Sequence, residues 1–174
     1  MGGFISQSMA LRNPDRVETL TLIMTSTGSR RVGRPSASVL KRMATLPAPQ
    51  TEAEAIEATV ETFRLIGSPD HFDEALVREK AAEAYQRAHD PDGRLRQLAA
   101  ILAQPDRTDR LRRLTIPTLV IHGLADPLVP VSGGMALAKA IPGATFLGFN
   151  GMGHDLPSTL WPKMTESILD LAGS

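Results

Sequence analysis

Two side chains that could do acid–base chemistry each follow an apolar stretch of the sequence. Asp126 comes shortly after the apolar residues 119–123, and His154 comes shortly after the apolar residues 144–149. A carboxylate and the histidine that it orients are two members of the triad that activates a nucleophile for acyl transfer. The two residues are 28 positions apart (154 − 126), which leaves room for one helix and one strand. Both loops are therefore expected at the carboxyl edge of one parallel sheet, with the carboxylate within reach of the imidazole.

Each of these residues also has an ordinary explanation. Asp126 is followed by a proline, and Asp-Pro is common in turns because the aspartate side chain can bond nearby backbone. A histidine in a loop often only satisfies neighbouring backbone groups. The prediction of an acid–histidine pair therefore depends on the two residues together.

The surrounding pattern predicts an α/β fold with about three parallel strands and flanking helices. Residues 1–13 are expected to form a helix with Phe4, Ile5 and Met9 on one apolar face. The short apolar run that follows is typical of a strand buried on both faces of a parallel sheet. The expected strands are residues 17–24, 118–121 and 144–149, and the further core helices are residues 131–140 and 159–171.

The long segment between the first two strands predicts an all-helical insertion, at residues 35–113. Residues 51–54 read Thr-Glu-Ala-Glu, which matches a capping box at the start of a helix. Residues 90–93 read Asp-Pro-Asp-Gly, which is a strong turn signal, and leucines at helical spacing follow at 95–102. The chain is therefore expected to divide into core residues 1–34, the insertion and core residues 114–174.

Composition narrows the function classes. The 19 basic and 19 acidic residues give a formal net charge of zero, which favours neither nucleic acid nor an anionic membrane as a partner. The absence of cysteine excludes disulfides and thiolate chemistry and fits a cytoplasmic protein. The four histidines have no metal-ligand spacing, so no metal is expected. No apolar run approaches the roughly 20 residues that span a bilayer.

The strand and loop motifs together resemble the C-terminal half of the α/β-hydrolase family. They are residues 116–123 (Ile-Pro-Thr-Leu-Val-Ile-His-Gly), 126–130 (Asp-Pro-Leu-Val-Pro) and 151–154 (Gly-Met-Gly-His). The resemblance is greatest to esterase-like members of the aclacinomycin methylesterase type, and the helical insertion resembles the family's cap. It covers essentially the whole chain. It implies hydrolysis of a small acyl or ester substrate without a cofactor, with Asp126 and His154 as catalytic residues.

The resemblance also bears on the first residues. The family's nucleophile lies in a G-x-S-x-G elbow that often continues Ser-Met-Gly-Gly, and this sequence begins Met1-Gly2-Gly3-Phe4. The nucleophilic serine would stand immediately before Met1, and the strands that precede it in the family would be absent as well. Met1 matches the residue whose backbone N–H contributes to the oxyanion hole, although here it is a free N-terminus. By this resemblance the isolated chain is expected to be inactive.

Other serines are weaker candidates for the nucleophile. Ser6 and Ser8 fall within the expected first helix, where nothing would activate a hydroxyl. Ser26 follows the first strand at the expected active-site edge and is the best substitute. We nevertheless expect residues 25–29 to line the pocket rather than to react.

A different class of function remains open from the sequence. The chain could be a noncatalytic ligand-binding or interaction module derived from a hydrolase. If the strand at 17–24 lacks its inner neighbour, its unpaired backbone groups form an open apolar edge, which favours association with a second copy.

Overall fold

The computed structural model describes residues 1–45, 49–88 and 90–173. Helices and strands alternate at the two ends of this chain, and helices alone lie between them. The elements are α1 (Gly2–Arg12), η1 (Pro14–Arg16), β1 (Leu20–Ile23), α2 (Ala37–Ala44), α3 (Glu52–Ile66), η2 (Pro69–His71), α4 (Glu74–Arg87), α5 (Pro91–Leu102), α6 (Thr108–Leu111), β2 (Thr118–Gly123), α7 (Ser132–Ala140), β3 (Thr145–Phe149), η3 (Ser158–Leu160) and α8 (Trp161–Ala172).

The three strands form one parallel sheet in the order β1-β2-β3, so the expected fold class is confirmed. Leu22 of β1 pairs with Val120 of β2, which in turn pairs with Phe146 of β3. Within the part of the chain that the structure describes, β1 has no second strand neighbour. In this order the two outer strands of the described chain, β1 and β3, each pair on one side only.

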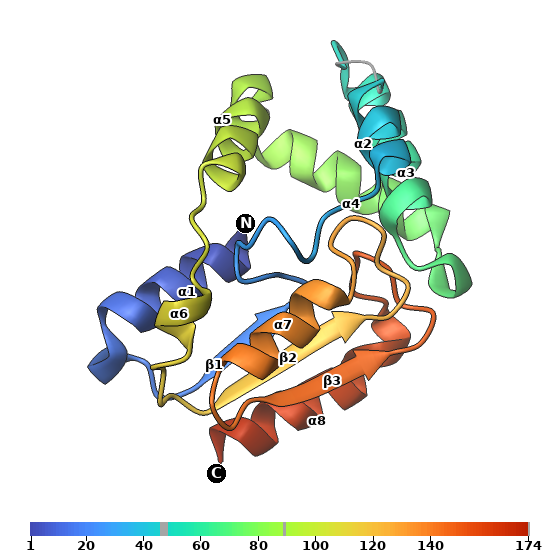
Figure 1. Cartoon of the computed structure of the whole chain (residues 1–174). Coiled ribbons are helices and arrows are strands. Elements are labelled where there is room, and N and C mark those ends of the chain that lie inside the picture. Colours follow the sequence, from blue (N-terminus) through green and yellow to red (C-terminus); the bar gives the residue numbers. More distant parts are fainter. Residues whose placement is uncertain (46–48, 89, 174) are drawn as a thin grey trace.

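Helices cover the two faces of the sheet unequally. Helix α7 lies against one face and α8 lies behind the other, while α1 and α6 lie beside β1 (Figure 1). Helices α2 to α5 stand apart from the strands, and the end of α3 reaches the loop that follows β3 (Figure 1). The sheet thus presents the ends of its strands to the helical insertion.

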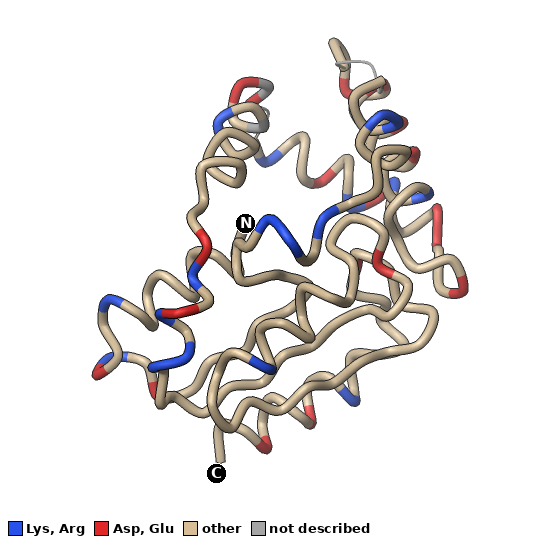
Figure 2. Tube along the Cα trace, in the orientation of Figure 1, with Lys and Arg blue, Asp and Glu red and all other residues tan. Residues whose placement is uncertain are grey.

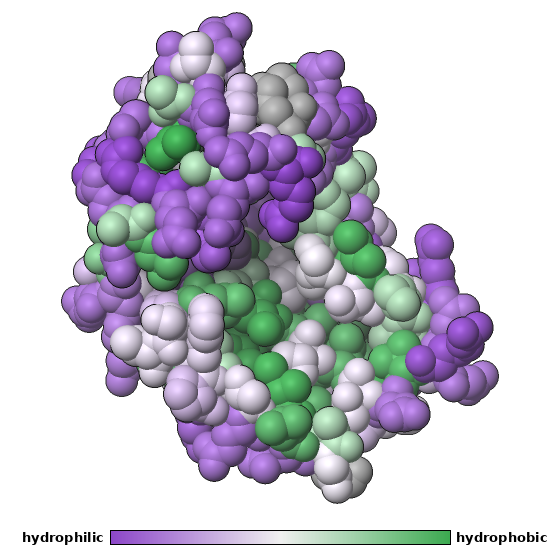
Figure 3. Space-filling model, turned by 180° about the vertical axis from the view of Figure 1, so that it is seen from behind, coloured by the Kyte–Doolittle hydropathy of each residue, from purple (hydrophilic) through white to green (hydrophobic). Residues whose placement is uncertain are grey.

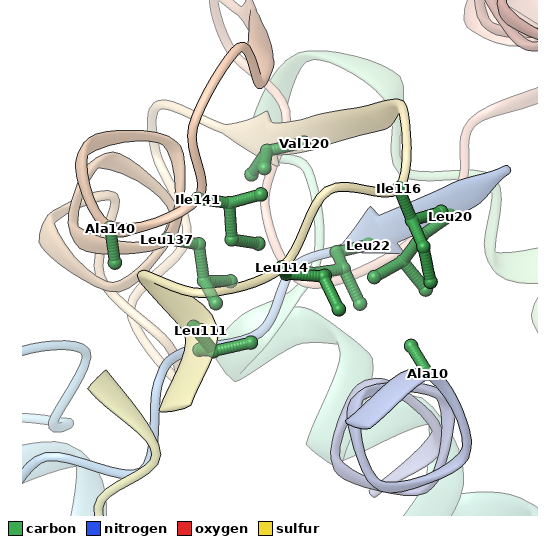
Figure 4. Close-up of a cluster of buried hydrophobic side chains, with 10 residues drawn as sticks. All are labelled: Ala10, Leu20, Leu22, Leu111, Leu114, Ile116, Val120, Leu137, Ala140 and Ile141. Atoms are coloured by element: carbon green, nitrogen blue, oxygen red, sulfur yellow. The ribbon is translucent and has the colours of Figure 1, made fainter. Parts of the chain in front are cut away.

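The core has two parts because successive residues of a strand point to opposite faces of a sheet. Val120 points toward α7, whereas Ile121 points toward α8 and packs near Met164. Figure 4 shows the larger cluster, which consists of Ala10, Leu20, Leu22, Leu111, Leu114, Ile116, Val120, Leu137, Ala140 and Ile141. Leu111 belongs to it although the sequence placed this residue in the insertion, so packing on the sheet begins already at α6.

Phe4, Ile5 and Met9 share one face of α1, as predicted, but this face is not the one that packs on the sheet. Ile5 and Met9 are 55% and 57% exposed, whereas Ala10 is fully buried. Small residues face the sheet because α1 lies very close to the chain after β1: a methyl group on Gly3 would lie 2.5 Å from the side chain of Thr25. Close approach, rather than side-chain hydrophobicity, decides which face of α1 is buried.

The prediction that the first strand is buried on both faces is also wrong. Leu20 and Leu22 are buried, while Thr21 and Ile23 are only half-buried. All six residues of the central strand β2, by contrast, are buried. The difference follows from coverage, because α8 packs against β2 and leaves that face of β1 less covered.

Residues 90–93 begin a helix instead of forming a turn. The Asp90 side chain accepts a hydrogen bond from the Gly93 N–H at 2.9 Å, and Pro91 occupies the first helical position of α5. Proline suits that position because its missing N–H would have no helical partner there. The expected leucines of this helix, at positions 95, 98 and 102, are exposed.

The capping box at the start of α3 is half formed. Thr51 Oγ1 accepts a hydrogen bond from the Glu54 N–H at 3.2 Å, as predicted. The Glu54 carboxylate reaches one residue further back than the motif requires and accepts from the Gln50 N–H at 2.7 Å. Both bonds still fix the entry into α3.

The surface of the molecule is divided by polarity. Charged residues lie on helices and loops, and the strands carry none (Figure 2). Seen from behind, apolar side chains gather in a broad central area (Figure 3). Large exposed apolar residues include Ile5 and Met9 of α1, Leu95, Leu98 and Leu102 of α5, and Trp161 and Leu169 of α8. Among the described residues, no helix has the length and hydrophobicity needed to cross a bilayer.

Candidate active site

The loops after β2 and β3 are joined to each other through backbone hydrogen bonds. The Leu124 N–H donates to the Phe149 carbonyl at 2.9 Å, and the Ala125 N–H donates to the Met152 carbonyl at 3.0 Å. Gly123 lies where the two loops meet, and a methyl group on it would come within 2.3 Å of the Met152 carbonyl oxygen. This position therefore requires glycine, because the two backbones touch where the strands end.

Asp126 is held by the turn that it begins. Its Oδ1 accepts hydrogen bonds from the backbone N–H groups of Leu128 and Val129 at 2.9 and 2.8 Å. The residue is only 4% exposed. The ordinary Asx-turn explanation is therefore correct, and it uses only one of the two carboxylate oxygens.

The other carboxylate oxygen meets His154. Asp126 Oδ2 lies 2.7 Å from His154 Nδ1, so the structure brings the two predicted residues together. A carboxylate can only accept, so Nδ1 carries the proton and the neutral ring presents a lone pair at Nε2. The His154 side chain is 26% exposed, whereas that of Asp126 is fully buried. The carboxylate is thus shielded from solvent, whereas the imidazole is partly exposed. Their geometry orients a histidine for general-base catalysis.

A second histidine, His122 of β2, binds the backbone of the acid loop, which is the loop after β2 that carries Asp126. His122 Nε2 lies 2.7 Å from the Val129 carbonyl, which can only accept, so this nitrogen carries the proton. Burial lowers the pKa of His122, although the Val129 carbonyl and the Asp126 carboxylate partly oppose the shift. The ring is therefore neutral near pH 7. Its Nδ1 is buried and has no hydrogen-bond partner among the described residues.

The histidine loop is held by the helical insertion. The His154 N–H donates to the Ile66 carbonyl at the end of α3 at 2.7 Å. The Gly153 N–H donates to the Ser68 hydroxyl at 2.9 Å, and that hydroxyl donates to Asp155 Oδ1. Residues far apart in the sequence thus hold the backbone of Gly153 and His154 and the side chain of Asp155.

The remaining candidate residues are not part of this pair. Met1 is 40% exposed at the start of α1, and no hydrogen bond among the described residues joins it to Asp126 or His154. Ser26 is buried, and its hydroxyl accepts from the Gly28 N–H at 3.3 Å within its own turn. The pocket lining predicted for residues 25–29 is thus not seen at positions 25–27, which are buried.

The hydroxyls of the first helix are also engaged elsewhere. Ser6 donates to the Gly2 carbonyl at 3.2 Å, and Ser8 accepts from the Arg107 guanidinium at 3.3 Å. Among the described residues, no group of three or more metal-ligating side chains stands together. The chemistry that this arrangement can do is proton transfer at His154 Nε2.

Sequence reasoning missed Ser68 and Asp155, whereas the resemblance to the family already implied a structural role for His122. Asp155 adjoins His154, which was a usable signal. Ser68 gave none, because it acts on residues 85 and 87 positions away and its surrounding sequence is that of an ordinary helix end.

Comparison with known proteins agrees with the fold. A family model described as the alpha/beta hydrolase fold matches residues 1–158. The chain therefore belongs to the α/β-hydrolase family.

Two relatives are esterases. Rhodomycin D methylesterase DnrP of Streptomyces peucetius is 30% identical over 97% of this chain and 63% of its own length. Pimeloyl-[acyl-carrier protein] methyl ester esterase of Chromobacterium violaceum is 28% identical over 88% of this chain and 60% of its own length. The enol-lactonase structure from Burkholderia xenovorans LB400 superimposes with a TM-score of 0.74 at 22% identity, over 100% of this chain and 63% of that one. The chain spans less than two thirds of the length of each.

Proposed function

We propose that this chain supplies the acid and the base of an α/β-hydrolase that cleaves carboxylic esters. The observation that carries the proposal is the 2.7 Å contact between Asp126 Oδ2 and His154 Nδ1, with Nε2 left as the base. Two methyl esterases among the relatives support an ester as the substrate. No step of this chemistry requires a cofactor.

In the proposed reaction His154 transfers one proton in each of two half-reactions. Nε2 takes the proton of the nucleophilic serine as its oxygen attacks the substrate carbonyl, and the imidazolium gives that proton to the leaving alcohol. In the second half-reaction Nε2 takes a proton from water as the water oxygen attacks the acyl-serine. The imidazolium then returns that proton to the serine oxygen as the carboxylic acid leaves. Asp126 keeps its charge throughout and stabilises the imidazolium. In the arrangement that the resemblance to the family implies, the serine would lie next to the position of Met1, whose N–H would help to hold the oxyanion.

We assign the helical insertion the role of a cap over this site. Support comes from its contacts, because the end of α3 bonds directly to the histidine loop. Residues 1–34 and 114–174 would then form the catalytic half, and the insertion would contribute apolar surface to an acyl pocket.

The experiment compares two forms of the protein with a small activated ester such as p-nitrophenyl acetate. The chain alone is expected to show turnover close to the uncatalysed rate. A fusion that places the nucleophile-bearing portion of rhodomycin D methylesterase ahead of Met1 is expected to hydrolyse the ester. His154→Ala should abolish that activity, because the serine would lose its base.

The control is Thr62→Ala, which removes a hydroxyl that bonds within α3, to the Ala58 carbonyl at 2.7 Å. It should leave the activity of the fusion unchanged. Strong turnover by the chain alone that survives His154→Ala would refute the assignment.

The open edge of β1 favours a second candidate, a noncatalytic interaction module. In the described chain β1 pairs on one side only, and large apolar side chains are exposed on neighbouring α1. An unpaired strand edge next to apolar surface is a site for self-association. Sedimentation over a range of concentrations tests this candidate. Dimerisation would support an interaction module, and a monomer at every concentration would exclude it.

A further inference from the structure

Ser68 is a buried polar residue in the helical insertion, and its hydroxyl is fully used by another part of the chain. It is 0% exposed, although it lies only two residues beyond the end of α3. Its oxygen accepts from the Gly153 N–H at 2.9 Å, and its proton is donated to Asp155 Oδ1. One hydroxyl therefore contacts both sequence neighbours of His154.

The backbone beside Ser68 holds His154 itself. The Ile66 carbonyl accepts from the His154 N–H at 2.7 Å. A methyl group on Gly153 would lie 2.2 Å from the Gly67 carbonyl oxygen, so the two backbones are in direct contact. Three successive residues of the histidine loop are thus bound by three successive residues of the insertion.

Further contacts extend the same junction. A methyl group on Gly151 would lie 2.6 Å from the Asp70 carboxylate, and Thr159 Oγ1 lies 3.1 Å from His71 Nδ1. The turn from residue 66 to residue 71 therefore follows the loop from residue 151 to residue 159 along its length. Among the described residues, no comparable junction with the insertion fixes Asp126, whose oxygens bind its own turn and His154.

We propose that Ser68 is a positioning residue for His154. By holding the Gly153 N–H and the Asp155 side chain it sets the direction of the His154 Cα–Cβ bond, and this keeps Nδ1 at Asp126 Oδ2. The inference rests on the proposed function for its meaning, since the base matters only if the site is catalytic. It also makes the base sensitive to the insertion, because a displacement of the end of α3 moves the loop that carries the imidazole.

The test reads the histidine directly, by NMR of the whole chain, and needs no turnover. The two readouts are the His154 Nδ1–H proton, which its bond to Asp126 should shift downfield and protect from exchange, and the exchange rates of the Gly153 and His154 amides. Ser68→Ala leaves the Gly153 N–H and the Asp155 carboxylate without their partner. Loss of such a bond costs about 1–3 kcal/mol, so amide exchange should rise about tenfold or more and the Nδ1–H signal should broaden or vanish.

Matched variants separate positioning from general destabilisation. Thr62→Ala removes a hydroxyl from α3 that bonds only within the helix, to the Ala58 carbonyl at 2.7 Å, and should leave the Nδ1–H signal unchanged. Asp155→Asn keeps an oxygen that can accept from Ser68 and should resemble the wild type. Asp155→Ala removes that acceptor and should move the signal in the direction of Ser68→Ala.

The outcomes are distinct for the two proposals. If the wild type shows no protected Nδ1–H signal, the acid–base pair and the proposed function fail together. If that signal is present and Ser68→Ala leaves it and the amide exchange rates unchanged, the role of Ser68 is wrong and the proposed function stands. If Ser68→Ala does not fold, the His154 Nδ1–H signals of Asp155→Asn and Asp155→Ala are compared instead. A weaker signal in Asp155→Ala supports the role of Ser68, and equal spectra for the two variants overturn it.

Discussion

The two loops of the candidate site are built in opposite ways. The Asp126 side chain is held mainly by residues near it in the sequence: it bonds the backbone two and three positions ahead, and His122 of the preceding strand bonds Val129. The histidine loop is held by the end of α3, through residues at least 85 positions away in the sequence. The acid is therefore placed by local structure, and the base is placed by tertiary structure.

This difference assigns different tasks to the two sides of the pair. A carboxylate that must stay charged and fixed benefits from a short, self-contained turn in a buried place. A base that must meet substrate is partly open, and here its position depends on the helices that we propose to form the cap. Changes in the insertion should therefore reach His154 before they reach Asp126.

The largest expected effect comes from Asp126 itself. Asp126→Ala removes the acceptor of two backbone N–H groups in a mostly buried turn and leaves His154 unpaired. Each unsatisfied group costs about 1–3 kcal/mol, so we expect a loss of about 3 kcal/mol in the free energy of unfolding. Urea-induced unfolding followed by circular dichroism measures this loss.

Asp126→Asn separates the two functions of this residue. The new amide oxygen can still accept from Leu128 and Val129, so the loop should stay folded. The amide nitrogen would face His154 Nδ1, which must then accept, and the ring proton moves to Nε2. Nitrogen-15 NMR of the imidazole reports the tautomer, and an unchanged tautomer would contradict the assigned hydrogen bond.

An intermediate effect is expected at the contact between α7 and β2. A methyl group on Gly134 would lie 2.4 Å from His122 Nδ1, which is buried beneath the acid loop. Gly134→Ala should therefore destabilise the protein by about 1–3 kcal/mol, even though alanine is the better helix former by about 1 kcal/mol. Gly2→Ala is the matched control, because nothing lies within 4 Å of its added methyl group. Thermal unfolding should rank the two variants in opposite directions from the wild type.

The sequence predicted the locally determined half of this structure well. The sheet, the alternation of its elements and the Asp126–His154 contact all follow from short motifs and their spacing. The burial of α1 and of β1 was mispredicted because it depends on what packs against them, and the pattern of Ile5 and Met9 carries no information about that. The role of Ser68 was unpredictable for the same reason, since it arises only when the end of α3 meets the histidine loop.

The smallest effect concerns His122 and depends on pH. Burial lowers the pKa of His122 in the folded chain below the ordinary value near 6.5, against the opposing influence of the Val129 carbonyl and the Asp126 carboxylate. Between the two pKa values the unfolded chain binds more protons than the folded chain. The stability that this residue contributes is therefore complete above about pH 6.5 and is lost as the pH falls, with a slope of at most about 1.4 kcal/mol per pH unit.

His122→Gln removes this titration while it keeps an N–H group that can donate to Val129. Between about pH 7 and pH 5 its free energy of unfolding should fall less steeply than that of the wild type, and the difference in urea midpoints measures the contribution of His122. Asp126 and His154 also lie near this ring, so the same comparison is repeated in the Asp126→Asn background. A steeper fall in His122→Gln than in the wild type would mean that the buried ring is charged in the folded state. The acid loop would then be held by an ion pair between His122 and Asp126, and it would weaken as the pH rises rather than as it falls.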